Sequence, residues 1–477
     1  MRSRKSKTPV IIEDVEIIDA GAEGKAIAKV DNKVLFIPFV VPGDVVDVRV
    51  GKSKKNFMEG KAVAFKKLSD KRTEPKCSHF GVCGGCKWQS MQYEYQLEYK
   101  QKQVVDNLER IGKVDTKGLQ PIFGSEEIFF YRNKLEFTFS NRRWRTDEEV
   151  KNPTEGATQN ALGFHIPLLF DKVLDISHCY LQAEPSNKIR NAIREYALRN
   201  GLSFYDIRNH EGYLRNLIIR NSTSGDWMLI LSVAEDDNAK LFPLLDFVKE
   251  SFPEITSLQY VINQKMNDTI QDLEIQTYSG NAYMTEVMPS FKKGFADLKF
   301  KIGPKSFYQT NSRQAYHLYS LAAEFAGFEG DEVVYDLYTG IGTIANFVAP
   351  HVKKVVGVEY VEDSIAEAKI NSELNGIENT SFYAGDMAKV FTKEFVEQNG
   401  VPDIIITDPP RSGMHEKVIE QLLEVAPKKI VYISCNPATQ ARDVDLLAEK
   451  YTVGRIQPVD MFPHTHHVEN IVELIRK

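Results

Sequence analysis

The chain has 477 residues, of which 42% are hydrophobic and 26% charged, and its formal net charge is −6. This length predicts two to four domains, and the composition excludes disordered and fibrous proteins. No apolar run reaches the length of a membrane span and no signal-peptide segment is found, so we expect a cytoplasmic protein with no membrane partner.

Residues 9–66 predict a small all-β module, because short β-rich runs alternate with turn residues. Gly21-Ala-Glu-Gly24 near its start and Val41-Pro-Gly-Asp44 midway resemble a TRAM domain, which is an OB-like, RNA-binding barrel. Residues 1–76 hold 17 Lys and Arg against 11 Asp and Glu, although the whole chain is acidic. This excess suits phosphate contacts by Lys54 in an expected loop, but an ordinary solvated surface explains it equally well.

Four of the five cysteines form a candidate metal site. Cys77, Cys83 and Cys86 have the spacing C-x5-C-x2-C, with glycines that let the backbone fold tightly. Cys179 is the candidate for a fourth ligand. Four thiolates suit zinc or an iron–sulfur cluster, and the spacing alone does not choose between them.

Residues 88–114 predict a helix, since Gly112 is the first Gly or Pro in the stretch. Tyr and Gln side chains crowd its surface, so we expect it to pack on another domain. Residues 116–300 predict a second, mostly β-stranded body. Basic side chains alternate there with aromatic ones, and Arg132, Lys134 and Arg215 are the candidates for RNA contact. A charged outer sheet face would give the same pattern.

From residue 301 the pattern becomes βαβ. A strand runs into Asp336-Leu-Tyr-Thr-Gly340-Ile-Gly342, and the next strand ends at Glu359. A Gly-rich turn followed by an acid at a strand end is how Rossmann-like folds hold a ribose. The spacing departs from the dinucleotide motif and resembles motif I of S-adenosylmethionine methyltransferases.

Cys435 follows an apolar strand of residues 430–433 and precedes Pro437, which stops the strand. This places the thiol at the carboxyl end of a strand, where open α/β sheets bind their ligands. A lone cysteine in such a position is most often a packing residue. The motifs around it decide between the two interpretations.

Taken together, the motifs resemble bacterial RNA uracil-5-methyltransferases that carry an N-terminal TRAM domain and a four-cysteine iron–sulfur cluster. The best-known member acts on 23S ribosomal RNA. Thr339 is a departure, because the family usually has a Cys there. The resemblance rests on six stretches in the family's order: Cys77-x5-Cys83-x2-Cys86 with Cys179, Ser306-Phe-Tyr-Gln-Thr-Asn311, Asp336-Leu-Tyr-Thr-Gly340, Asp408-Pro-Pro-Arg-Ser-Gly413, Ser434-Cys-Asn-Pro437 and Asp460-Met-Phe-Pro-His-Thr-His-His-Val-Glu469.

The resemblance implies a multidomain α/β monomer that methylates 23S ribosomal RNA. Its domains would be a TRAM barrel over 1–72, a β-rich central domain with the cluster over 73–300, and a Rossmann-like class I methyltransferase domain over 301–477. The implied cofactors are S-adenosylmethionine and a [4Fe-4S] cluster, with zinc left open. The implied S-adenosylmethionine site consists of Gln309, Tyr338, Gly340, Thr343, Glu359, Asp386 and Asp408.

The implied chemistry uses Cys435 as the nucleophile on uracil carbon 6 and Glu469 as the general base. Asp408 and Arg411 would orient the uracil. We expect the surroundings of Cys435 to lower its thiol pKa.

Two alternatives remain at this stage. One is a tRNA uracil-5-methyltransferase, although the usual members are shorter and lack both the TRAM module and the cysteine cluster. The other is a non-catalytic RNA-binding protein, which predicts loss of Cys435, Glu469 or Asp408, and all three are present.

Overall fold

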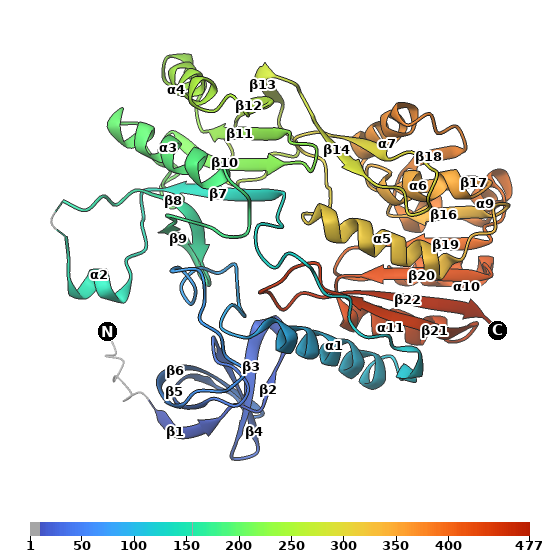
Figure 1. Ribbon diagram of the computed structural model, residues 1–477, viewed down its shortest axis with the longest axis horizontal. Helices are drawn as coiled ribbons and strands as arrows, with labels where there is room; N and C mark the ends of the chain where they lie inside the picture. The colour runs from blue at the N-terminus through green and yellow to red at the C-terminus, as the bar shows by residue number, and fades with distance from the viewer. Residues whose placement is uncertain (1–9, 155) are drawn as a thin grey trace, which may run out of the picture.

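The computed structural model describes residues 10–154 and 156–477, which form three bodies joined around one long helix (Figure 1). The N-terminal body is a sheet of six strands in the order β1-β5-β6-β4-β3-β2. Its apolar side chains enclose a small core of their own, as a barrel-like module requires. Its elements are β1 (Ile11–Glu16), β2 (Asp19–Ala20), the 3-10 helix η1 (Ala22–Gly24), β3 (Lys25–Val30), β4 (Lys33–Pro38), β5 (Val45–Ser53) and β6 (Phe57–Lys67).

The central body is built on a seven-stranded sheet in the order β13-β12-β11-β10-β7-β8-β9. Helices α3 and α4 contribute to its core together with the central strands. Its elements are β7 (Lys134–Ser140), α2 (Asp147–Lys151), β8 (Ala161–Ile166), β9 (Leu169–Asp175), α3 (Ser186–Arg199), β10 (Leu214–Asn221), β11 (Trp227–Val233), α4 (Asn238–Ser251), β12 (Ser257–Ile262) and β13 (Ile275–Gly280).

The C-terminal body is a doubly wound α/β domain, as the βαβ pattern predicts. Its seven-stranded sheet has the order β18-β17-β16-β19-β20-β22-β21, in which β22 runs antiparallel to both of its neighbours. Its elements are α5 (Ser312–Ala326), β16 (Val333–Leu337), α6 (Thr343–Val348), η3 (Ala349–His351), β17 (Lys354–Glu359), α7 (Glu362–Leu374), β18 (Thr380–Ala384), α8 (Met387–Val390), α9 (Lys393–Asn399), β19 (Ile404–Thr407), α10 (Glu416–Val425), β20 (Lys429–Ser434), α11 (Pro437–Leu447), β21 (Tyr451–Val459) and β22 (Glu469–Arg476).

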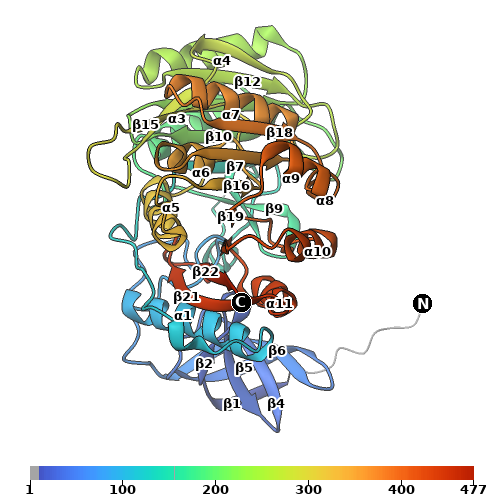
Figure 2. The same ribbon diagram turned by 90° about the vertical axis from the view of Figure 1, so that its right-hand side faces the viewer.

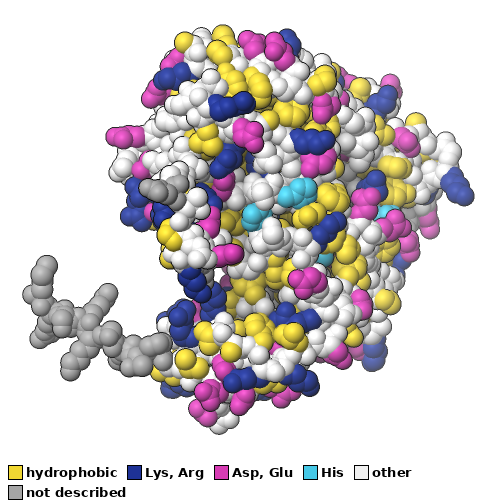
Figure 3. Space-filling view, turned by 60° about the vertical axis from the view of Figure 1, so that its left-hand side comes forward, with side chains coloured by type: hydrophobic (Ala, Val, Ile, Leu, Met, Phe, Trp, Pro, Cys, Tyr) yellow, Lys and Arg dark blue, Asp and Glu magenta, His cyan; other side chains and the backbone are white. Residues whose placement is uncertain are grey.

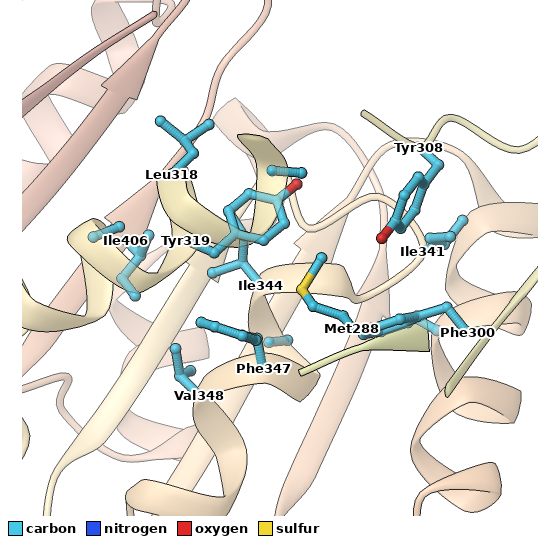
Figure 4. Packing of buried hydrophobic residues seen from close by; sticks show 14 of the residues in the cluster. Met288, Phe300, Tyr308, Leu318, Tyr319, Ile341, Ile344, Phe347, Val348 and Ile406 are labelled. Carbon is cyan, nitrogen blue, oxygen red and sulfur yellow. The ribbon is translucent and has the colours of Figure 1, made fainter. Parts of the chain in front are cut away.

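Strand side chains of this domain alternate between two separate cores, because successive residues of a strand point to opposite faces. Ile404 and Ile406 pack with α5, α6 and α7, whereas Ile405 packs with α8 to α11 on the other face. Figure 2 shows the two helix layers on either side of the sheet. Figure 4 shows the first core, where Leu318 and Tyr319 of α5 lie over Ile344 and Phe347 of α6. The sheet is thus buried on both faces, and its carboxyl edge remains for a ligand.

Helix α1 (Tyr93–Arg110) links the N-terminal body to the rest of the chain and packs against α11 and β21. The short helix η2 (Thr116–Gly118) follows it, and the chain then runs beside β21. A hairpin of β14 (Met284–Met288) and β15 (Leu298–Ile302) spans the expected boundary at residue 301. In this hairpin, the backbone N–H of Lys301 donates to Asn371 Oδ1 of α7, in the C-terminal domain, at 2.8 Å. No helix in the described residues is long and apolar enough to cross a membrane.

Candidate active site

The strand register places Cys435 opposite Glu469. Strands β20 and β22 are antiparallel and pair Ser434 with Asn470, so the next pair outward is Cys435 and Glu469. Opposite residues in such a pair point to the same face, with Cβ atoms about 5 Å apart. Glu469 is buried, with 4% of its surface exposed, and Cys435 is partly exposed. A thiol and a buried carboxyl therefore lie side by side at the sheet edge.

Asp408 and Arg411 reach the same edge from the neighbouring strand. Asp408 follows β19 directly, and its backbone N–H donates to the carbonyl of Leu337 at 3.4 Å. The carbonyl of Arg411 accepts hydrogen bonds from Asn436 Nδ2 at 2.9 Å and from Thr439 Oγ1 at 3.2 Å. These bonds fix the 408–413 loop beside Cys435 and leave the Arg411 side chain exposed over the site.

The two carboxyl groups hold their protons more tightly than usual. Burial raises the pKa of Glu469 to about 8, and the negative charge of Asp408 adds to this rise. Burial also raises the pKa of Asp408 to about 7. The pair therefore retains protons near neutral pH, which is the range in which a general acid or base is effective.

The expectation of a lowered thiol pKa at Cys435 is wrong for the RNA-free site. Burial raises the pKa of Cys435 to about 11, and the charges of Glu469 and Asp408 raise it further than the Arg411 guanidinium lowers it. The thiol is therefore protonated at rest. A neighbouring carboxylate is placed to take that proton.

The Gly-rich turn forms one wall of a neighbouring pocket. Positive φ angles occur at three residues of the turn: 67° at Tyr338, 56° at Gly340 and 76° at Gly342. Glycine adopts such angles without strain, whereas Tyr338 is strained. The N–H of Gly340 donates to Glu359 Oε2 at 3.1 Å. Tyr338 and Asp386 line a cavity of about 1040 Å³ that extends beneath the 410–417 loop. This volume suits a nucleoside-sized ligand.

Two of the expected S-adenosylmethionine residues, Tyr338 and Asp386, line this pocket, whereas Gly340, Glu359 and Asp408 do not border it. Gln309 is buried farther along the sheet edge beside Tyr319, and its carbonyl accepts from Asn133 Nδ2 at 2.9 Å. Thr343 is buried at the first turn of α6. Neither Gln309 nor Thr343 lines the 1040 Å³ cavity.

Sequence reasoning missed two residues of the site. Asp336 is fully buried and accepts a hydrogen bond from the N–H of Ala345 at 2.9 Å, and burial raises its pKa to about 7. Its place in the motif D-x-x-x-G-x-G was a usable signal. Tyr319 is buried near Asp408 and Glu469, and burial first, then these charges, raise its pKa well above the usual value. Its helical spacing looks like ordinary core packing, so the sequence held no such signal.

The four cysteines of the predicted metal site line one cavity of about 730 Å³ between the 77–86 segment and the central domain. Burial raises the thiol pKa of Cys83 to about 11 and of Cys86 to about 12. In residues 10–154 and 156–477, no group of three or more His, Cys, Asp or Glu converges on a point that would hold a single metal ion.

The four expected RNA contacts differ in accessibility. Lys54 is exposed in the turn between β5 and β6, whereas Arg132 and Lys134 are half-buried. Arg132 lies over the Phe462 ring at 5.2 Å and lines the cysteine cavity. Arg215 is 1% exposed and donates to the carbonyls of Asn263 and Asn267. Direct phosphate contact by Arg215 is therefore contradicted, because its donors are already used inside the domain.

Lys and Arg side chains gather at a notch between the N-terminal body and the rest of the molecule (Figure 3). The same face presents histidines and apolar side chains farther in. A surface of this kind attracts phosphate at its margin and offers ring faces inside.

Comparison with known proteins gives two family matches. Residues 277–477 match the model of the tRNA (Uracil-5-)-methyltransferase family, and residues 6–63 match that of the TRAM domain.

Curated relatives extend the similarity to nearly the whole chain. A protein of Bacteroides thetaiotaomicron named "Uncharacterized RNA methyltransferase" is 57% identical, covering 95% of this chain and 99% of its own. One of Porphyromonas gingivalis with the same name is 55% identical, covering 97% and 99%.

Among solved structures, the Pyrococcus abyssi tRNA (uracil-54, C5)-methyltransferase in complex with S-adenosyl-L-homocysteine is 27% identical. It covers 97% of this chain and 100% of its own, with a TM-score of 0.73.

Proposed function

This chain belongs to the family of RNA uracil-5-methyltransferases that carry a TRAM domain, and from that membership we propose that it transfers a methyl group from S-adenosylmethionine to carbon 5 of a uridine in 23S ribosomal RNA. The observation that supports the chemistry is that Cys435 and Glu469 directly flank the paired residues Ser434 and Asn470, close enough for the Glu469 charge to raise the thiol pKa. Carbon 5 of uracil is a poor nucleophile, so the reaction needs a thiol and a base within reach of one ring.

The reaction starts at the thiol. Asp408 takes the Cys435 proton, because its pKa of about 7 lies near neutral pH and Glu469 must stay unprotonated for the later step. The thiolate then forms a bond to uracil carbon 6, and the electron pair of the 5,6 double bond moves toward the carbon-4 oxygen. Arg411 stands exposed above the site, where its guanidinium can stabilise that oxygen.

The second half of the reaction restores the ring. Bound S-adenosylmethionine supplies an electrophilic methyl group, and the activated carbon 5 takes it. A carboxylate of the pair then removes the carbon-5 proton, and we assign this step to Glu469. The double bond re-forms as the bond between Cys435 sulfur and carbon 6 breaks, and the sulfur leaves as a thiolate. The thiolate takes back its proton from Asp408, and Glu469 releases the carbon-5 proton to solvent, which returns the enzyme to its starting state.

A target base within folded RNA must leave its stack to reach Cys435, because the thiol lies at a recessed sheet edge. The exposed Lys54 of the TRAM domain and the half-buried Arg132 and Lys134 of the central domain are proposed to hold the flanking RNA. Phosphate contacts of this kind position the RNA without reading its sequence.

An iron–sulfur cluster is proposed at the four cysteines, with zinc as the alternative, because all four thiols line one cavity of about 730 Å³ and therefore face a common space. Cys77, Cys83, Cys86 and Cys179 would hold it, and no step above requires an electron from it.

A tRNA substrate is the second candidate. The Pyrococcus abyssi structure is of a tRNA (uracil-54, C5)-methyltransferase and spans 97% of this chain. Chain length therefore does not separate tRNA enzymes from ribosomal RNA enzymes, contrary to the sequence-based argument.

One experiment tests both the chemistry and the substrate. Mapping of 5-methyluridine in 23S ribosomal RNA and tRNA from a deletion strain should show one or more 23S positions that lose the methyl group. Complementation with the wild-type gene should restore the methyl group, and complementation with Cys435→Ala should not. Loss confined to tRNA would replace the 23S proposal, and unchanged 5-methyluridine in both RNAs would refute the function.

A further inference from the structure

Three aromatic rings surround one lysine beside the cysteine cavity. The Lys76 Nζ lies 5.0 Å from the Phe129 ring, 5.1 Å from Phe130 and 4.8 Å from Tyr180. The rings of Phe130 and Tyr180 are 6.0 Å apart. The His178 ring also packs on Tyr180, with the ring centroids 4.2 Å apart. We call Lys76, Phe130 and Tyr180 the aromatic platform.

The Phe130 ring is held in solvent by an unfavourable backbone conformation. Phe130 is 39% exposed and has φ of 57°, a left-handed conformation that a bulky residue rarely adopts. Its N–H donates to the carbonyl of Tyr180 at 2.7 Å, so the conformation is fixed by a bond between the two ring-bearing segments. Strained backbone of this kind concentrates at ligand-binding positions.

The positive charge of Lys76 is also not neutralised by a carboxylate. Lys76 is exposed, and no carboxylate in the described part of the chain lies within salt-bridge distance of its ammonium group. A cation without an acidic partner, next to the exposed Phe130 ring, offers one phosphate contact and a stacking face together. Single-stranded nucleic acids are bound by this combination.

We propose that the aromatic platform binds one unpaired nucleotide of the RNA substrate, with its base stacked on the exposed Phe130 ring, which Tyr180 supports, and its phosphate on Lys76. This inference deepens the proposed function and rests on it for the identity of the RNA. A base with an exposed face stacks on an aromatic ring whatever its sequence, so the subsite selects unpaired RNA rather than a particular base.

The platform is close enough to the active site to hold a nucleotide that flanks the target. The Phe129 ring packs on His464 at 4.4 Å. His464 precedes Glu469 by five residues, which span at most about 18 Å of extended chain. The proposed nucleotide therefore lies within a few nucleotides of the uridine at Cys435.

The test measures binding of the full chain to a short fluorescent oligoadenylate, which contains no uridine. Phe130→Ala should weaken binding about 5- to 150-fold, the effect of losing one stacked base. Lys76→Met should also weaken binding and should reduce the slope of log affinity against log salt by about 0.7, whereas Phe130→Ala should leave that slope unchanged. Phe130→Trp should retain binding even if the alanine variant folds poorly.

Phe170→Ala is the matched control. Phe170 is 63% exposed on the same domain and has Arg208 over its ring at 5.5 Å, but Arg208 is already paired with Asp171 at 2.6 Å. Equal losses in the two alanine variants, or no loss at Phe130, would overturn the platform. The probe cannot be methylated, so the two proposals can fail separately. If the variants lose binding as expected but the wild-type protein does not methylate 23S ribosomal RNA, only the proposed function is refuted. If the protein methylates 23S ribosomal RNA but Phe130→Ala binds the probe as the wild type does, only the platform is refuted.

Discussion

Replacing Glu469 with Gln should separate the two halves of the reaction. The amide keeps the shape of the side chain but cannot accept the carbon-5 proton, so the methylated adduct on Cys435 cannot resolve. A general base contributes about 10²- to 10⁴-fold to a rate, and turnover should fall by that factor. Adduct formation should survive, because the negative charge of Glu469 raises the thiol pKa and its removal makes the thiolate easier to form.

The assay is denaturing electrophoresis of enzyme with uridine-containing RNA and S-adenosylmethionine labelled in the methyl group. Glu469→Gln should accumulate a labelled protein–RNA complex that survives denaturation, whereas Cys435→Ala should give none. Asp408→Asn is the comparison that isolates the base, because it removes the neighbouring carboxylate and leaves Glu469 in place. If Glu469→Gln released free methylated RNA at the wild-type rate, the assignment of the base would be wrong. If it formed no complex, the first proton would have to go to Glu469 rather than to Asp408.

Three further predictions concern pH, a buried ion pair and the cluster. Because Glu469 is protonated below a pKa of about 8, kcat/KM should fall about tenfold per pH unit below that value, and a profile flat between pH 6 and 8 would contradict this assignment. Lys100→Met leaves the fully buried carboxylate of Asp460 without the ammonium 2.6 Å away, so urea unfolding should show a loss of about 3–5 kcal/mol. A Lys100→Met/Asp460→Leu double variant should recover most of that loss, and a double variant as unstable as the single one would show that packing dominates. Cys86→Ser should abolish the brown colour and the iron content of anaerobically purified protein, and a colourless wild type with stoichiometric zinc would rule out the iron–sulfur cluster.

The position of Cys435, the proposed nucleophile, was predictable from local rules. The apolar run that became β20 ends at Ser434, and Pro437 begins α11, so the sequence alone placed Cys435 at the carboxyl edge. Its partner was not predictable in this way. Glu469 lies opposite only because β22 returns antiparallel through the end of a parallel sheet. Hydrophobic periodicity carries no information on such a register, and the family motif supplied the residue.

Two errors have the same physical cause. Arg215 lies on β10, which is paired on both edges and buried on both faces. Residue alternation along this strand therefore does not identify the side chains that face solvent. The direction of the Cys435 pKa shift was likewise set by burial next to two carboxyls that are distant in sequence. Both depend on which elements cover a strand, and that is a tertiary property.

The segment 460–468 connects the active site to every other body of the molecule. Asp460 is held by Lys100 of α1, and the carbonyl of His464 accepts the N–H groups of Lys87 and Trp88 at 2.8 and 3.0 Å. The indole of Trp88 in turn donates to the carbonyl of Gly24 in the TRAM domain at 3.3 Å. This segment leads directly into the proposed base. A substitution at the TRAM or cysteine interface can therefore displace the base without touching RNA, and only a binding measurement beside the turnover measurement distinguishes a lost RNA contact from a displaced base.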